Sequence, residues 1–286
     1  MPGEKNRRLV ALALAGATAA GVLARRVWTL NPHVVRVSGG VALVYTVRRG
    51  AGEPVRVLRT GGVYQSATYL GSLRMEPVFA YYRALARLFE LRPAARRVLV
   101  IGGGGFAFPK LVASEHPGVR TDVVEIDPAV VRAARRWFFL DEAVALARAG
   151  GGDLSVFCDD GRAFLERGCG PYDAVVLDAF VGAEPASSLA TVGALRAARR
   201  ALVPGGVLLA NVVSREGGSD VEFLRSFVAT ARLAFANVVV APASDEERSA
   251  EDNYLVVASD GDVELADAIA YDEDFLGAVL LDDEPC

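Results

Sequence analysis

The sequence predicts an α/β protein with a mostly parallel, doubly wound sheet, preceded by a small antiparallel β-subdomain and an N-terminal apolar helix. Residues 97–127 read as apolar strand, glycine turn, helix and second apolar strand, which is one βαβ unit. Two further apolar strands, residues 153–158 and 172–177, are each followed by an aspartate. Ahead of the unit, residues 34–70 alternate short β-rich runs with glycine turns, which predicts an antiparallel meander.

Composition excludes several classes of protein. Of the 286 residues, 52% are hydrophobic and 23% are charged, so the chain can bury a substantial core. The net charge of -4 gives no general attraction to nucleic acid, and no nucleic-acid partner is expected. Three cysteines and two histidines lack metal-ligand spacing, so no metal site is expected. We divide the chain into an N-terminal segment (1–33), a β-subdomain (34–72) and a larger α/β domain (73–286).

The N-terminal segment contains an uncharged, mostly apolar run, residues 9–24, with two arginines on each side. As a helix it reaches roughly 24 Å, which is short of the ~30 Å hydrocarbon core of a membrane. Three interpretations stay open: a membrane anchor, an amphipathic or partner-packed helix, and a signal peptide, although the arginine pair after the run is a poor cleavage context. We expect a cytoplasmic protein. Attachment to the inner face of the plasma membrane through residues 9–24 and a homodimer are open hypotheses.

Charge is spread unevenly along the chain. Residues 1–60 hold about ten lysines and arginines against two acidic residues, and residues 245–286 hold about fifteen acidic residues against one arginine. We interpret the two regions as solvated faces. Between them, residues 76–91 have apolar residues at helical spacing, which predicts a helix that faces the core.

Four consecutive glycines, Gly102, Gly103, Gly104 and Gly105, follow the first strand of the βαβ unit. Without side chains, backbone N–H groups at the start of a helix can approach a nucleotide or nucleoside closely. Glu125, at the end of the second strand and about twenty residues further on, is the candidate to accept the ribose hydroxyls. A tight turn that binds nothing is the alternative. The missing third glycine of the G-x-G-x-x-G fingerprint argues against a nicotinamide cofactor.

The GGGGF turn and the EID strand end resemble the first motif of class I S-adenosylmethionine-dependent transferases, and more closely that of the spermidine synthase family, whose turn is GGGDG. The resemblance implies a Rossmann-like class I methyltransferase fold, with a seven-stranded sheet that residues 237–241 and 253–258 close as an antiparallel hairpin. It also implies the ribose role for Glu125. Gly105 replaces the family's aspartate, which helps to hold the amine end of the aminopropyl donor. Residues 61–65 resemble the family's substrate-lining D-G-x-x-Q turn, so Gln65 is a candidate contact, with a surface glutamine as the alternative.

Two aspartates complete the resemblance. Asp160 matches the family's GDG-x-x-FL motif, which implies contact with the adenine amine, and the alternative is that an aspartate here caps the next helix. Asp178 matches the first aspartate of D-S-S-D-P, which takes a proton from the attacking amine, and the alternative is a solvated loop carboxylate. Val181 stands at the second aspartate, so the amine lacks one fixed partner. The DAF sequence, followed by a proline and a small or polar run, is more similar to the orphan branch of spermidine synthase-like proteins than to the dedicated polyamine enzymes.

Two functional classes follow from these residues. The first is a spermidine synthase-like transferase that binds S-adenosylmethionine or decarboxylated S-adenosylmethionine and moves an aminopropyl or methyl group to a small-molecule amine substrate. The second is a catalytically silent nucleoside-binding or scaffold protein of the same fold. Glu125, Asp160 and Asp178 favour the first, and the changes at Gly105 and Val181 favour the second.

Overall fold

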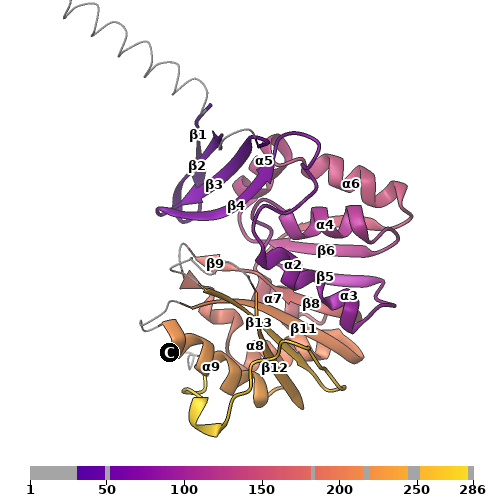
Figure 1. Ribbon diagram of the computed structural model, residues 1–286, viewed down its shortest axis with the longest axis vertical. Helices are drawn as coiled ribbons and strands as arrows, with labels where there is room; N and C mark the ends of the chain where they lie inside the picture. Colours follow the sequence, from indigo (N-terminus) through magenta and orange to yellow (C-terminus); the bar gives the residue numbers. More distant parts are fainter. Residues whose placement is uncertain (1–30, 49–51, 182–183, 215–219, 244–251, 283–286) are drawn as a thin grey trace, which may run out of the picture.

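A computed structural model of the protein describes residues 31–48, 52–181, 184–214, 220–243 and 252–282. The expected N-terminal apolar helix, with its three interpretations, lies outside the described residues. Within them, no helix is both long enough and apolar enough to cross a membrane. The described chain forms a small antiparallel sheet at one end of the molecule and a large, mostly parallel sheet beside it (Figure 1).

The small sheet is a four-stranded antiparallel meander, as the sequence predicts. Its β-branched and aromatic residues suit a pleated, half-buried surface. Gly61 and Gly62 join the last two strands with φ angles of 59° and 88°, a left-handed conformation that fits a two-residue hairpin turn. In spatial as well as chain order, the strands are β1 (His33–Val37), β2 (Gly40–Val47), β3 (Val55–Thr60) and β4 (Val63–Tyr69).

The large sheet contains seven strands among the described residues. They are β5 (Arg97–Ile101), β6 (Arg120–Glu125), β7 (Asp153–Cys158), β8 (Tyr172–Leu177), β11 (Leu202–Ser214), β12 (Asn237–Pro242) and β13 (Asp252–Ser259). Their spatial order is β12-β13-β11-β8-β5-β6-β7. The strands from β7 to β11 are parallel, whereas β13 is antiparallel to both of its neighbours, which confirms the closing hairpin. The strand order reverses between β5 and β8, and open α/β sheets bind ligands at such a point.

Helices cover both faces of the large sheet (Figure 1). Alternate residues of β5 therefore enter two different hydrophobic cores: Val98 and Val100 enter the first, and Leu99 and Ile101 enter the second. This burial on both faces is why the parallel strands are continuous apolar runs. The helices are α2 (Tyr81–Ala86), α3 (Leu88–Leu91), α4 (Ala107–Glu115), α5 (Pro128–Trp137), α6 (Leu140–Ala149), α7 (Gly161–Glu166), α8 (Val192–Ala201) and α9 (Asp220–Arg232). Short elements are strands β9 (Phe180–Val181) and β10 (Glu184–Pro185), and 3-10 turns η1 (Ser187–Leu189) and η2 (Glu273–Phe275).

Two helix boundaries differ from the sequence prediction. The helix predicted over residues 76–91 begins at Tyr81, because Pro77 pairs with Thr68 of β4 in a β-bridge and residues 78–80 form bends and a turn. It is also divided into α2 and α3. Pro128 is of a residue type common in the first turn of a helix, and it predicts a helix from there through Phe139. The helix ends at Trp137 instead, and Phe139 adopts a left-handed conformation (φ 62°) from which α6 begins.

Two sets of hydrogen bonds fix the small sheet against the large domain. The buried Lys110 ammonium of α4 donates to Thr68 Oγ1 at 2.6 Å and to the Arg74 carbonyl at 2.9 Å. The Ser38 backbone N–H, in the turn between β1 and β2, donates to Asp127 Oδ2 at 2.5 Å. Asp127 also caps α5 through the Ala129 N–H at 2.7 Å. The small sheet is thereby held beside the carboxyl ends of the large sheet's strands.

Candidate functional site

A cavity of about 370 Å³ lies where the small sheet meets the carboxyl ends of β5, β6, β7 and β8. This is the point where the strand order of the large sheet reverses, as expected for a ligand site in this architecture. All seven residues that the sequence singles out line this one cavity, so the fold brings together groups that are more than a hundred positions apart in the chain. They are Gln65, Gly102, Gly103, Gly104, Glu125, Asp160 and Asp178.

Glu125 binds the glycine turn directly. Its buried carboxylate accepts the N–H groups of Gly103 (2.9 Å) and Gly104 (3.1 Å) through Oε2, and the Asp127 N–H (3.0 Å) through Oε1. We expected these turn N–H groups to face a ligand, and in the structure two of them face Glu125 instead. A carboxylate has about four acceptor positions. Three are occupied, and Oε1 keeps one for a ligand hydroxyl.

Glycine is required in the turn because other groups approach it closely. Gly102 has φ 100°, and an added Cβ would lie 2.2 Å from the Asp178 carbonyl oxygen. An added Cβ on Gly103 would lie 2.8 Å from the ring of Phe106, a fully buried side chain beneath the turn. Phe106 itself has φ 57°, a left-handed conformation that is unfavourable by on the order of 1 kcal/mol for any residue with a side chain. Burial of its ring offsets that cost.

Gly105 does not face the cavity. It is absent from the described lining, and an added Cβ would lie 2.4 Å from Ser66 Oγ and 3.0 Å from the Phe138 ring. The family resemblance implied that this position faces the donor. In the structure Ser66 of β4 covers it, so the substitution Gly105→Asp requires space that the small sheet occupies.

Asp178 lies directly after β8 and is half-buried at the cavity wall. Its Oδ1 accepts the Asn211 side-chain N–H at 3.0 Å, and Asn211 Oδ1 accepts the Asn253 side-chain N–H at 3.1 Å. Burial raises the pKa of Asp178 to about 7, although the Asn211 hydrogen bond opposes the rise. Asp178 is therefore not the solvated loop carboxylate that we considered as the alternative. A carboxyl group with this pKa can exchange a proton at neutral pH.

Sequence reasoning missed several residues of the site. Tyr81 and Tyr82 of α2 line the cavity with ring centroids 4.0 Å apart. Burial and the nearby Asp178 carboxylate raise the pKa of both phenols, which keeps them protonated as hydrogen-bond donors. Their helical spacing indicated only a core-facing helix. Asn253 was predicted only as the first residue of a strand in the closing hairpin, and Asn211 was not singled out. The available signal was that each is a polar residue next to an apolar run.

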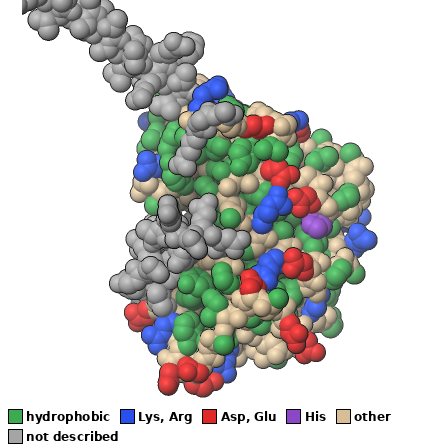
Figure 2. Space-filling model, viewed as in Figure 1, with side chains coloured by type: hydrophobic (Ala, Val, Ile, Leu, Met, Phe, Trp, Pro, Cys, Tyr) green, Lys and Arg blue, Asp and Glu red, His purple; other side chains and the backbone are tan. Residues whose placement is uncertain are grey.

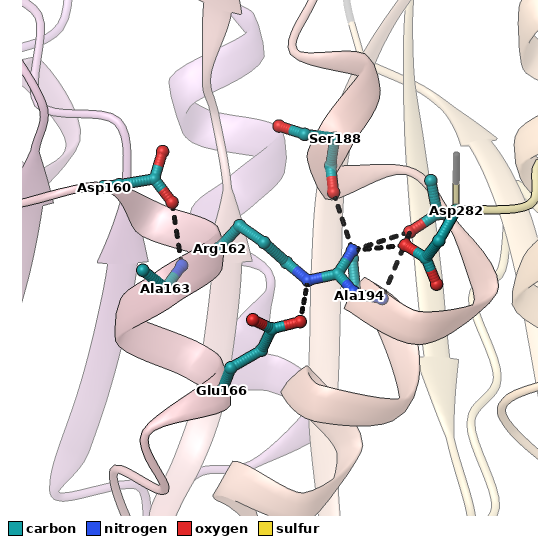
Figure 3. Close-up of polar contacts among 8 residues, drawn as sticks. Asp160, Arg162, Ala163, Glu166, Ser188, Ala194 and Asp282 are labelled. Carbon is teal, nitrogen blue, oxygen red and sulfur yellow. Dashed lines mark hydrogen bonds and ion pairs between the residues drawn. The ribbon is translucent and has the colours of Figure 1, made fainter. Parts of the chain in front are cut away.

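Asp160 caps α7, since its Oδ1 accepts the Ala163 N–H at 2.8 Å (Figure 3). The capping alternative is therefore correct, while contact with adenine stays a prediction. Two residues further on, the Arg162 guanidinium binds acceptors from four segments (Figure 3). They are Glu166 Oε1 (2.6 Å), the Ser188 carbonyl (3.1 Å), Thr191 Oγ1 (2.8 Å) and Asp282 Oδ1 (2.7 Å). Because Asp160 and Ser188 both line the cavity, Arg162 fixes one of its walls.

We expect Arg162→Ala to lower the free energy of unfolding by about 1 to 3 kcal/mol, because it leaves Asp282 and the Ser188 carbonyl without their charged donor. The Arg162 side chain is only 19% exposed. Arg167→Ala is the matched control, directly after the same helix, since that side chain is 57% exposed and its ion pair is with Asp159. Its loss should stay within about 0.5 kcal/mol. Denaturant unfolding measures both, and equal losses would contradict the role of Arg162.

The chain is similar to known proteins in both sequence and structure. The spermine/spermidine synthase domain matches residues 78–228. A polyamine aminopropyltransferase of Vibrio vulnificus (strain CMCP6) is 32% identical over 139 residues, which are 48% of this chain and 44% of that protein. The chain spans about half the length of the curated relatives it matches.

Two solved structures support the fold. A probable spermidine synthase from Corynebacterium glutamicum ATCC 13032 has a TM-score of 0.66 and 24% identity, with 81% of each chain covered. Human methyltransferase-like protein 13 in complex with SAH has a TM-score of 0.51 and 21% identity, with 67% of this chain and 86% of that chain covered. These likenesses confirm the predicted Rossmann-like class I methyltransferase fold. Because the family's domain matches more than half of its residues, this chain belongs to the spermine/spermidine synthase family.

Proposed function

We propose that this protein is a transferase that binds S-adenosylmethionine or its decarboxylated form in the cavity and transfers an aminopropyl or methyl group to a small amine. The observation that carries the proposal is the charge of the cavity. Four carboxyl groups line it, and its described lining contains no lysine, arginine or histidine. Such a site favours a cationic sulfonium donor and a cationic amine over anionic ligands. The carboxyl groups belong to Glu125, Asp127, Asp160 and Asp178.

In the proposed reaction, Asp178 acts as the general base. An amine is protonated at neutral pH and must lose a proton before its nitrogen can attack the carbon bound to sulfur. The C–N bond forms as the C–S bond breaks, the bonding electron pair returns to sulfur, and the neutral thioether leaves. The proton passes to Asp178, whose pKa of about 7 allows it to accept that proton and release it again. Asn211 holds the carboxylate in place during the transfer.

The nucleoside part of the donor is assigned to the other strand ends. Glu125 is proposed to accept a ribose hydroxyl at the free position of Oε1, and Asp160 to accept the adenine amine while it caps α7. Gln65, on the small sheet, is proposed to contact the substrate. The similarity to a polyamine aminopropyltransferase supports aminopropyl transfer as the chemistry.

The residues of the glycine turn indicate which of the two donors this protein can bind. The family's aspartate, which suits the purely cationic tail of the decarboxylated donor, is replaced by Gly105, and the described lining has no acidic residue within the turn. A carboxylate that faced the donor from this turn would repel the carboxylate of ordinary S-adenosylmethionine, and the described lining of the turn contains none. We therefore infer that this protein discriminates against ordinary S-adenosylmethionine less than spermidine synthases do.

Calorimetric titration with S-adenosylmethionine, its decarboxylated form and methylthioadenosine tests the proposal. We expect the two donors to bind with dissociation constants within roughly tenfold of each other, a difference of about 1.4 kcal/mol. A strong preference for the decarboxylated form would overturn the donor inference, and no binding of any of the three would overturn the function.

The second candidate is a nucleoside-binding protein that does not catalyse transfer. The absence of an acidic residue at Val181 favours it, because the amine then lacks the second carboxylate that the family motif supplies. Binding of the nucleosides without product formation from any small amine would select this candidate.

A further inference from the structure

One face of the small sheet presents hydrophobic and basic side chains to solvent. Val34, Leu43, Arg59 and Tyr64 stand opposite one another across β1, β2, β3 and β4. Val34 is 70% exposed, Leu43 42% and Tyr64 49%. The next row pairs Arg36 with Val41, which is 54% exposed. We name these six residues the outer patch, and Figure 2 shows hydrophobic side chains gathered over this sheet with basic side chains at their margin.

The basic residues of the outer patch have no acidic neighbours on the small sheet. The Arg59 guanidinium lies 5.5 Å from the Tyr64 ring centroid and donates to the Gly62 carbonyl at 2.8 Å, so it is held on the surface. Glu53 is the single acidic residue among residues 31–70. Its carboxylate accepts the backbone N–H groups of residues 71–73, so it is already bound elsewhere. The outer patch is therefore apolar and positively charged.

The charge of the outer patch decides between its conceivable occupants. Residues 9–24 are flanked by four arginines, so packing them on the patch would bring like charges together. A second copy of the patch would likewise place arginines against arginines. An anionic bilayer complements both features, because exposed apolar side chains enter the headgroup region while arginines bind lipid phosphates.

We propose that the outer patch docks on the surface of an anionic lipid bilayer. The distribution of charge along the chain orients the molecule on that surface. Among the described residues, positions 31–60 hold four arginines and one acidic residue, whereas positions 252–282 hold nine acidic residues and no lysine or arginine. In Figure 1 the described C-terminal segment lies at the opposite end of the molecule from β1–β4. The basic end faces the bilayer and the acidic end points away. Docking through this sheet face does not depend on the proposed transferase activity.

A fluorescent label on the outer patch tests the contact in the full chain. With Cys158, Cys169 and Cys286 replaced by serine, Leu43→Cys carries a nitrobenzoxadiazole label, and Leu233→Cys, at a position 54% exposed and outside the sheet, carries it as the control. Vesicles of phosphatidylcholine mixed with phosphatidylglycerol should shift the emission at position 43 to the blue and leave position 233 unchanged. Vesicles of phosphatidylcholine alone should change neither.

Three results would overturn the proposal. The first is no response at position 43, and the second is an equal response at both positions. The third is a label at position 43 that is already protected from iodide quenching without vesicles. Protection that disappears on dilution would identify a second copy as the occupant, and protection that survives dilution would identify residues 9–24.

Charge reversal distinguishes binding through the outer patch from attraction of the vesicles by the overall charge of the protein. The double variant Arg36→Glu with Arg59→Glu should lower the apparent affinity for the anionic vesicles by roughly tenfold or more in low salt. Arg120→Glu with Arg196→Glu makes the same change in net charge at exposed positions outside the small sheet and should lower it much less. Equal losses in both double variants would show attraction without a docking face and contradict the proposal.

Discussion

Asp178→Asn is expected to lower the rate of group transfer by roughly 10²- to 10⁴-fold, the usual contribution of a positioned general base. Asparagine keeps the shape of the side chain and the hydrogen bond from Asn211, but it cannot take the proton from the amine. In the wild type, kcat/KM should rise with pH through the pKa of about 7, as Asp178 becomes the carboxylate. Steady-state rates across pH for both proteins measure the effect. A variant with wild-type activity would remove Asp178 from the mechanism.

The same substitution, although it lowers the rate, should raise the free energy of unfolding at pH 8. The folded state raises the pKa of Asp178 from 3.8 to about 7, so the native protein binds this proton more tightly than the unfolded chain does. Wild-type stability should therefore fall as pH rises from about 4 to 7, by up to about 4 kcal/mol. The asparagine side chain does not titrate, so the Asp178→Asn variant should be the more stable protein at pH 8 and should lose this advantage near pH 4. Urea unfolding at both pH values tests the sign.

Asp173→Asn is the matched control because it lies at the other end of the same strand, β8. Asp173 Oδ2 accepts the backbone N–H groups of Arg96 (2.7 Å) and Arg97 (2.8 Å), far from the cavity. This variant should leave the rate and its pH dependence unchanged. A loss of rate in Asp173→Asn equal to that in Asp178→Asn would mean that both act through the sheet and not through proton transfer.

Glu125→Ala is expected to weaken nucleoside binding by about 1.5 to 3 kcal/mol, which is about 10- to 150-fold in the dissociation constant. It should also lower the free energy of unfolding by about 2 to 4 kcal/mol, because three backbone N–H groups lose their acceptor. Calorimetric titration and denaturant unfolding measure the two effects separately. An unchanged affinity would place the nucleoside elsewhere.

Two variants separate the structural and binding roles of this side chain. Glu125→Gln keeps the volume, but its amide NH₂ cannot accept, so it should disrupt the bonds on one side of the carboxylate and give an intermediate loss of stability. Glu115→Ala, at the end of α4, removes an exposed carboxylate paired with Arg83 and should change neither quantity much.

The order of elements was predictable because each depends on local chemistry. The meander follows β-branched runs between glycine turns, and the parallel strands follow apolar runs that must be buried on both faces. The ends of helices were less predictable, as Pro77 shows. Its pairing with Thr68, nine residues away, delays the start of α2 to Tyr81. No local pattern contains that contact.

The sequence by itself determined which residue types stand at the strand ends, and therefore that Glu125, Asp160 and Asp178 meet at one edge of the sheet, because the carboxyl ends of parallel strands share that edge. Only the tertiary structure decided what each group does there. Glu125 bonds the glycine turn, Asn211 reaches Asp178 from a neighbouring strand, and Ser66 of the small sheet covers Gly105. The reason is physical. Hydrogen bonds, pKa shifts and close contacts depend on distances between segments remote in sequence, and those distances exist only after the two sheets have packed together.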